Sequence, residues 1–192
     1  MLGLCALLLA AYAVGSIPTG YWLCKYFFGI TITEHGSGNI GASNVGRVLG
    51  KKWFIVIFLV DACKAFGLLV MGAAAGFSLT ALYPVGALLL VGNAYSPFLK
   101  FSGGKGVATA VGIISFFLPP LFTLTFVATW ISVLLLAREA FLASLIAMLV
   151  VLVGLASIGG GDVFTYMTGV FFWLLFRHRS NIASWCQKRR KV

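Results

Sequence analysis

Charged residues are scarce in this 192-residue chain, and acidic residues are the scarcest. Only 9% of the residues are charged, and Asp and Glu together number 4 against 14 Lys and Arg. A soluble domain carries roughly 25% charged residues, whereas 61% of this chain is hydrophobic. The composition excludes a water-soluble enzyme, a secreted disulfide scaffold and a disordered tail, and it indicates an integral membrane protein.

Paired cysteines and metal-ligand motifs are also missing from the sequence. The four cysteines lie far apart and form no CxxC or Cys/His spacing; they are Cys5, Cys24, Cys63 and Cys186. Spacing of that kind would be needed to predict a zinc site or a redox pair. No two carboxylates have the spacing of an acid/base pair or a two-metal site. We therefore expect no metal and no cofactor.

Long apolar runs fill most of the chain. A helix needs about 20 apolar residues to span a membrane, and seven runs are candidates: residues 2–24, 53–76, 78–95, 107–118, 121–137, 140–157 and 163–176. The fourth run is short and ends at two prolines, which break a helix. We predict an all-α, single integral membrane domain over residues 1–192, a bundle of about seven transmembrane helices. Fusing two pairs of runs would give five.

The positions of the basic residues predict an orientation. Short cytoplasmic loops carry the excess of Lys and Arg, and every basic residue except Lys64 lies in one of four alternate segments: residues 25–52, 96–106, 138–139 and 177–191. This places the N-terminus outside and the C-terminus in the cytoplasm. Because the basic residues lie between apolar spans and not on a soluble face, the net charge of +10 does not predict nucleic-acid binding.

Asp61 and Lys64 are exceptional, because both lie inside the second apolar run. A lone charge at the bilayer centre costs about 2.5–3.5 kcal/mol on insertion scales. Asp61 and Lys64 are three residues apart, so we predict that they pair with each other inside the bundle.

The segment GSGNIGASNVGR, from Gly36 to Arg47, is rich in glycine and small polar residues. Glycine permits a positive φ and lets backbone N–H groups converge on an anion. Arg47 adds a planar fork suited to phosphate. The segment predicts a phosphate site, with a flexible interhelical loop as the alternative.

The segment FSGGKGVATAVG, from Phe101 to Gly112, leads directly into an apolar helix. A helix N-terminus beside Lys105 is suited to bind an anion. The segment is not a Walker A loop, because Leu99 replaces the first glycine and Gly106 replaces the Ser or Thr, so nucleotide hydrolysis is disfavoured. The alternative is a helix cap with a lysine at the lipid headgroups.

The segment RHRSNI, from Arg177 to Ile182, follows the last apolar run. Arg177 and Arg179 fit a juxtamembrane anchor. His178 and Asn181 would share a helix face if the helix continued, and neither is required for anchoring. They are the better site candidates.

These three segments, in this order and spacing, resemble the bacterial membrane glycerol-3-phosphate acyltransferases that use acyl phosphate as the donor. The resemblance implies a seven-helix bundle in the bacterial inner membrane with its active site facing the cytoplasm. It also implies the partners acyl phosphate, glycerol 3-phosphate and membrane lipid, and the products 1-acyl-glycerol-3-phosphate (lysophosphatidic acid) and phosphate, in the first step of phospholipid synthesis. The motifs do not encode acyl-chain length or oligomeric state.

The resemblance also implies roles for individual residues. The catalytic candidates are Ser37, Arg47, Lys105, His178 and Asn181. The substrate-binding candidates are Gly36, Gly38, Asn39, Ser43, Asn44, Ser102, Gly103, Gly104 and Gly106. Two departures stand out: Asn93 replaces a histidine that the family commonly has, and the tail lacks the family's glutamate.

The HxxxxD pattern of other glycerolipid acyltransferases is absent, and no Ser/His/Asp set is apparent. Direct attack by the substrate hydroxyl is therefore favoured over an acyl-enzyme. The base would be the substrate's own phosphate or His178. The rival class is a phosphate or organophosphate transporter, whose site would lie near the membrane midplane on broken helices.

Overall fold

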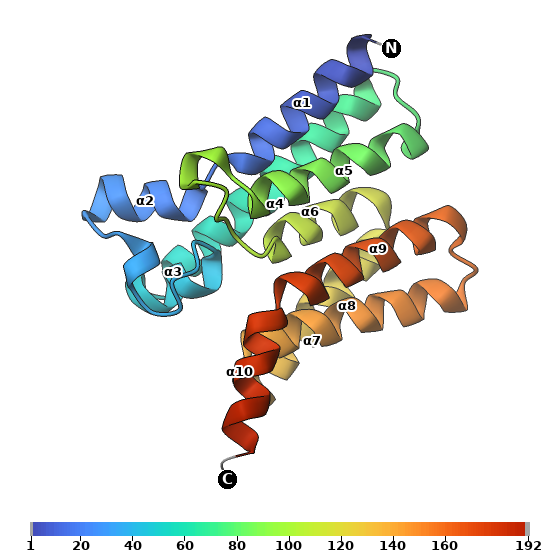
Figure 1. Cartoon of the computed structure of the whole chain (residues 1–192). Coiled ribbons are helices and arrows are strands. Elements are labelled where there is room, and N and C mark those ends of the chain that lie inside the picture. The colour runs from blue at the N-terminus through green and yellow to red at the C-terminus, as the bar shows by residue number, and fades with distance from the viewer. Residues whose placement is uncertain (1, 191–192) are drawn as a thin grey trace. The chain divides into compact units, whose positions relative to one another are not determined.

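The computed structural model describes residues 2–190, and in that range the chain is helical with no strand (Figure 1). The α-helices are α1 Leu2–Ser16, α2 Thr19–Phe28, α3 Ala42–Leu49, α4 Lys51–Ala74, α5 Leu79–Ala94, α6 Val107–Phe117, α7 Pro120–Ala137, α8 Ala140–Ser157, α9 Gly161–Arg177 and α10 Arg179–Arg189. Two short 3-10 helices are η1 Ile32–Glu34 and η2 Pro97–Leu99. The predicted all-α membrane fold is confirmed. Lys191, part of the predicted basic tail, lies outside the described residues.

Helices α1 to α6 form the first of two compact units, Met1–Phe117. Within this unit α1 packs along α5, and α4 packs against both α3 and α6. Small residues allow close approach of the helix backbones, since a Cβ on Gly92 would lie 2.4 Å from the carbonyl oxygen of Tyr12. Such small-residue contacts are typical of helices that pack in a membrane.

Helices α7 to α10 form the second compact unit, Leu118–Val192. Within this unit, helix α8 packs against both α7 and α9. The indole Nε1 of Trp130 on α7 donates to the hydroxyl of Ser144 on α8 at 3.1 Å. The two units are compact by their own contacts, so the prediction of a single domain stays a prediction.

Each of the seven predicted apolar runs contains helix, but the helices differ in length. Among the described residues, four helical segments can cross a membrane by length and composition, namely α4, α5 together with η2, α7 and α8, and the count becomes five if α1 and α2 form one bent span. The described α6 has only 11 residues, and Pro119 and Pro120 follow its end as the sequence predicts.

The first predicted span differs from the expectation of one continuous run over residues 2–24. The chain leaves α1 after Ser16 and enters α2 at Thr19, and the two helices are bent by 44°. Pro18 explains the break, because proline lacks an N–H and its ring clashes with the preceding turn of a helix.

Candidate active site

The first glycine-rich loop is built on a small apolar core. Ile32 and Val45 are fully buried, and Ile40 is nearly so. These side chains form one cluster with the start of α4, where Ile57 lies. The cluster holds η1, the loop and α3 together, so the loop has a defined shape and the alternative of a flexible interhelical loop is not favoured.

Asn44 organises the polar side of this first loop. Its side chain is 2% exposed. The amide nitrogen donates to the carbonyl oxygens of His35 and Asn39, both at 2.9 Å, and the amide oxygen accepts from the N–H of Ser37 at 2.8 Å. These contacts give Asn44 a scaffolding role, while its predicted substrate contact stays a prediction.

Several N–H groups expected to face an anion are used inside the loop. The N–H of Gly38 donates to His35, and that of Gly41 donates to the side-chain oxygen of Asn39 at 2.9 Å. The loop therefore offers an anion mainly its side chains. The expectation that the glycine N–H groups themselves converge on a phosphate stays a prediction.

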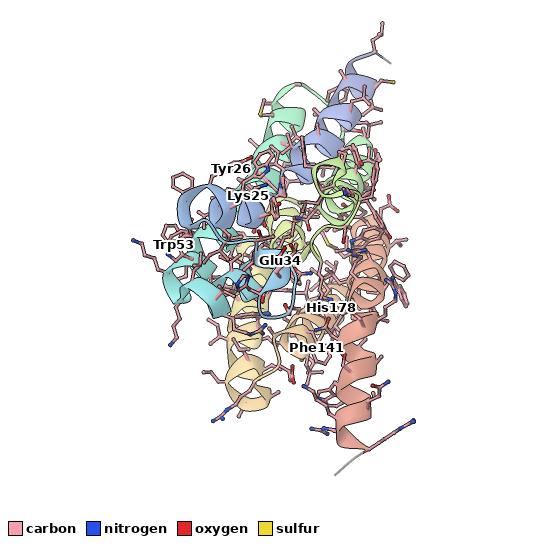
Figure 2. The ribbon with its side chains drawn as sticks, turned by 60° about the vertical axis from the view of Figure 1, so that its left-hand side comes forward. Lys25, Tyr26, Glu34, Trp53, Phe141 and His178 are labelled. Atoms are coloured by element: carbon pink, nitrogen blue, oxygen red, sulfur yellow. The ribbon has the colours of Figure 1, made fainter. Side chains whose placement is uncertain are left out.

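The exposed face of α3 presents two of the predicted site residues of the first loop. Ser43 and Arg47 lie one turn apart and are exposed, whereas Asn44 and Val45 on the same helix are buried. Arg47 makes no hydrogen bond or ion pair with the described part of the chain. Its guanidinium is thus available to a phosphate. Figure 2 shows this part of the unit around Glu34 and Trp53.

The second glycine-rich loop is attached to the end of α5. The N–H of Gly103 donates to the carbonyl of Ala94 at 2.9 Å, and that of Gly104 donates to the carbonyl of Asn93 at 2.8 Å. In this structure these two N–H groups bond to the end of α5, and the predicted substrate contact of both glycines stays a prediction. The first turn of α6 remains, because its N–H groups have no acceptor within the helix, and the half-buried Lys105 precedes it.

Asn93 lies against this second loop. It is 7% exposed, and its side-chain oxygen has no hydrogen-bond partner among residues 2–190. A Cβ on Gly104 would lie 2.7 Å from that oxygen. The departure from the family's histidine thus falls at a buried polar position beside the loop.

The structure brings the first two loops to the same part of the first unit. Leu99, in η2, packs against the apolar cluster under the first loop. The ring of Phe98 contacts Trp22 on α2, with centroids 5.3 Å apart. Arg47 and Lys105 therefore belong to loops that share one apolar support.

The third segment lies in the second unit, at the junction of α9 and α10 (Figure 2). His178 is 3% exposed, and its Nδ1 lies 2.8 Å from the carbonyl oxygen of Leu174. A carbonyl oxygen only accepts, so Nδ1 donates this hydrogen bond and carries a proton. Asn181 follows one turn later, in the first turn of α10. The helix does not continue through His178, because α9 ends at Arg177 and α10 begins at Arg179, so the expectation that His178 and Asn181 share one helix face stays a prediction.

The described residues contain no group of three or more His, Cys, Asp or Glu placed to hold a metal ion. Polar chemistry in the three segments rests on cations, amides, hydroxyls and one imidazole. These groups can bind and orient phosphates and can stabilise negative charge.

Comparison with known proteins gives one consistent family. A family model described as glycerol-3-phosphate acyltransferase matches residues 5–188. A glycerol-3-phosphate acyltransferase of Desulforudis audaxviator is 41% identical over 174 residues, covering 90% of this chain and 86% of that protein. One from Geobacillus kaustophilus is 38% identical over 181 residues, covering 92% of this chain and 89% of that protein.

Two solved structures are similar over nearly the whole chain. Both are of PlsY (YgiH), described as an integral membrane glycerol 3-phosphate acyltransferase, and both are 32% identical to this chain. The glycerol 3-phosphate form has a TM-score of 0.88 and covers 97% of this chain and 94% of its own. The lysophosphatidic acid form has a TM-score of 0.86 and covers 97% and 93%.

Gly103 and Gly104 of the second loop should respond differently to alanine. A Cβ on Gly103 would lie 2.1 Å from the backbone oxygen of Asn93, whereas a Cβ on Gly104 meets that residue's side chain. We expect both single substitutions to lower acyl transfer to glycerol 3-phosphate, measured on purified protein, because each displaces the loop. Asn93→Ala removes the side chain that the Cβ of Gly104→Ala would meet, but not the backbone oxygen that the Cβ of Gly103→Ala would meet. With Asn93→Ala alone as the reference, we therefore expect activity to recover in the double variant with Gly104→Ala and not in the one with Gly103→Ala. Equal recovery for both would contradict this geometry.

Proposed function

The chain belongs to the glycerol-3-phosphate acyltransferase family, and from that premise we propose that it transfers a fatty acyl group from acyl phosphate to the 1-hydroxyl of glycerol 3-phosphate. The products would be 1-acyl-glycerol-3-phosphate and inorganic phosphate. Acylation of glycerol 3-phosphate is the activity of this family, and the acyl phosphate donor is our inference. The observation that carries it is the pair of cation-bearing loops on one apolar support, since donor and acceptor each bring a phosphate.

Direct transfer is the mechanism that these residues support best. The 1-hydroxyl oxygen of glycerol 3-phosphate attacks the carbonyl carbon of acyl phosphate, and the bond from that carbon to the phosphate oxygen breaks. Phosphate leaves with the bonding electrons. The hydroxyl proton passes to a base, for which two groups qualify: the phosphate of the acceptor and Nε2 of His178.

The protein would contribute positioning and charge stabilisation in this step. We assign Ser37, Asn39, Ser43 and Arg47 of the first loop, with Asn181, to orienting the donor and its carbonyl. Lys105, the glycines of the second loop and His178 are assigned to the phosphate groups. Negative charge grows on the carbonyl oxygen and on the leaving phosphate, and preorganised cations and N–H donors lower its energy.

We also propose the setting of the reaction. The chain is an integral membrane protein of a bacterial family, and the alternation of basic and neutral segments supports a place in the inner membrane with the three segments on the cytoplasmic side. We propose that residues 1–192 act as one domain, because the family model matches residues from both compact units. The count of seven spans also remains a proposal, and it rests on the alternation of basic and neutral segments.

The donor can be tested directly with purified protein and labelled glycerol 3-phosphate. We expect lysophosphatidic acid to form with acyl phosphate and not with acyl-CoA, because the sequence lacks the HxxxxD motif of other glycerolipid acyltransferases. Product formation also separates an enzyme from a transporter, which needs none. Efficient turnover with acyl-CoA alone would overturn the choice of donor.

Arg47 and Lys105 should act on the rate of the chemical step. Losing one donor that stabilises transition-state charge typically lowers kcat by about 10²–10³, and we expect losses of that order for Arg47→Ala and Lys105→Ala. Arg47→Lys should recover little, because an ammonium cannot reproduce the two-pronged contact of a guanidinium.

Steady-state kinetics on folded variants checks this assignment. Lys51→Ala is a matched control, since Lys51 is an exposed cation at the start of α4 that has no assigned role and should keep normal kinetics. If the Arg47 and Lys105 variants kept kcat and only raised KM, these side chains would recruit substrate without stabilising the transition state.

A further inference from the structure

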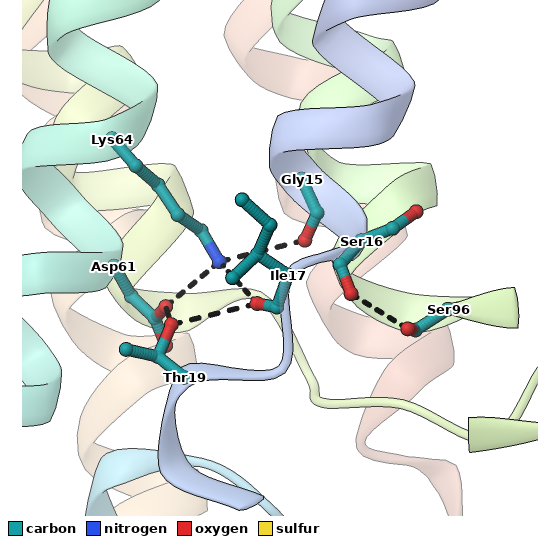
Figure 3. Close-up of polar contacts among 7 residues, drawn as sticks. All are labelled: Gly15, Ser16, Ile17, Thr19, Asp61, Lys64 and Ser96. Atoms are coloured by element: carbon teal, nitrogen blue, oxygen red, sulfur yellow. Dashed lines mark hydrogen bonds and ion pairs between the residues drawn. The ribbon is translucent and has the colours of Figure 1, made fainter. Parts of the chain in front are cut away.

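The predicted ion pair inside α4 is present, and it faces the break between α1 and α2 (Figure 3). The ammonium of Lys64 lies 2.8 Å from the carboxylate of Asp61, and both side chains are 10% exposed. Lys64 also donates to the backbone carbonyls of Ile17 at 3.0 Å and Gly15 at 3.4 Å. The hydroxyl of Thr19 donates to Asp61 at 2.7 Å.

The orientation of the pair matches the ends of the two helices. Lys64 meets carbonyls at the C-terminus of α1, where the helix dipole is negative. Asp61 meets Thr19, the first residue of α2, where the dipole is positive. The last carbonyls of α1 have no N–H partner further along the helix, because α1 ends at Ser16. One ion pair thus compensates both ends of the broken span.

The break is in direct contact with the first glycine-rich loop. A Cβ on Gly20, in the first turn of α2, would lie only 2.1 Å from the carbonyl oxygen of Ile40. Gly20 is buried, and Ile40 lies in the middle of the first loop. A shift of α2 at its first turn would therefore move or release the backbone of that loop.

The break is also bonded to the segment that leads from α5 into the second loop. The hydroxyl of Ser96 donates to the carbonyl of Ser16 at 2.6 Å, and this bond is buried (Figure 3). One residue earlier, the carbonyl of Tyr95 accepts from the hydroxyl of Tyr12 at 2.9 Å. Residues 15–20 therefore touch the support of both loops.

We propose that Asp61 and Lys64 are positioning residues for the acyl transfer, which fix the α1–α2 break and through it the spacing of the two glycine-rich loops. This inference rests on the proposed function for its kinetic consequence. The polarity of the pair is the essential feature, because Lys64 serves carbonyl acceptors and Asp61 serves a hydroxyl donor. A pair that only neutralised two charges in the membrane would work equally well when reversed.

The reversed variant Asp61→Lys with Lys64→Asp tests that polarity. It keeps two opposite charges three residues apart but presents a carboxylate to the carbonyls of α1. A displacement of about 1 Å in a catalytic site can cost about 100-fold in rate, so we expect kcat to fall by that order. Lys64→Arg should retain most of the activity, because a guanidinium can donate to the same carbonyls. Normal kcat in the reversed variant would overturn the proposal.

The loop spacing itself can be measured without substrate. Cysteines are introduced at Glu34 and Pro97, two exposed positions beside the loops, in a background that lacks the four native cysteines. Spin labels on these two cysteines report the distance between them by pulsed electron paramagnetic resonance. We expect a narrow distribution for the wild-type pair and for Lys64→Arg, and a broadened or shifted one for the reversed variant. An unchanged distribution in a folded reversed variant would refute the proposal, whatever donor the enzyme uses.

Thr19→Val provides the decisive comparison if the reversed variant does not fold. This near-isosteric change removes only the hydroxyl that donates to Asp61. We expect the same direction of effect as in the reversed variant, with a smaller change in both distance distribution and kcat. If Thr19→Val matched the wild type in both distance distribution and kcat, the break would not depend on the pair.

Discussion

A break in a membrane helix must be compensated within the protein, because the hydrocarbon offers no water to its backbone groups. In this chain Pro18 creates the break, and a Lys and an Asp from α4 compensate it. A buried ion pair would be costly on its own. It becomes favourable here because the lysine also donates to carbonyls at the end of α1 and the aspartate also accepts from the first residue of α2. The first compact unit is organised around that contact, since the supports of both glycine-rich loops touch it.

The two loops are held in different ways. The first depends on a side chain, because the amide of Asn44 bonds to three backbone groups of the loop. The second depends on backbone contacts with the last carbonyls of α5. In both cases N–H groups that could have met a phosphate are used to fix the loop. Fewer backbone donors are then left for a ligand, but the loops form a fixed frame for Arg47 and Lys105. A fixed frame lowers the reorganisation of the site that the reaction needs.

The sequence predicted the helices, the Asp61–Lys64 pairing and the helix end before Pro119, because each follows from local composition or a spacing of a few residues. It did not predict the partners of that pair, since Gly15 and Ile17 lie 49 and 47 residues from Lys64. The use of the glycine N–H groups was also missed. A glycine-rich segment is compatible with anion binding and with tight packing alike, and only the positions of Asn44 and α5 decide between them.

Glycine in and beside these loops therefore serves close packing of the backbone, whereas its abundance suggests anion binding. At Gly20 and Gly103 a Cβ would meet a backbone carbonyl at 2.1 Å, so these glycines bring segments of the chain into contact with each other. In the mechanism we propose, the anions are met by side chains placed by those contacts, namely an arginine on an exposed helix face and a lysine ahead of α6. A small enzyme without a nucleophilic triad has to rely on such placement, because its rate depends on how accurately two phosphates and one carbonyl are held.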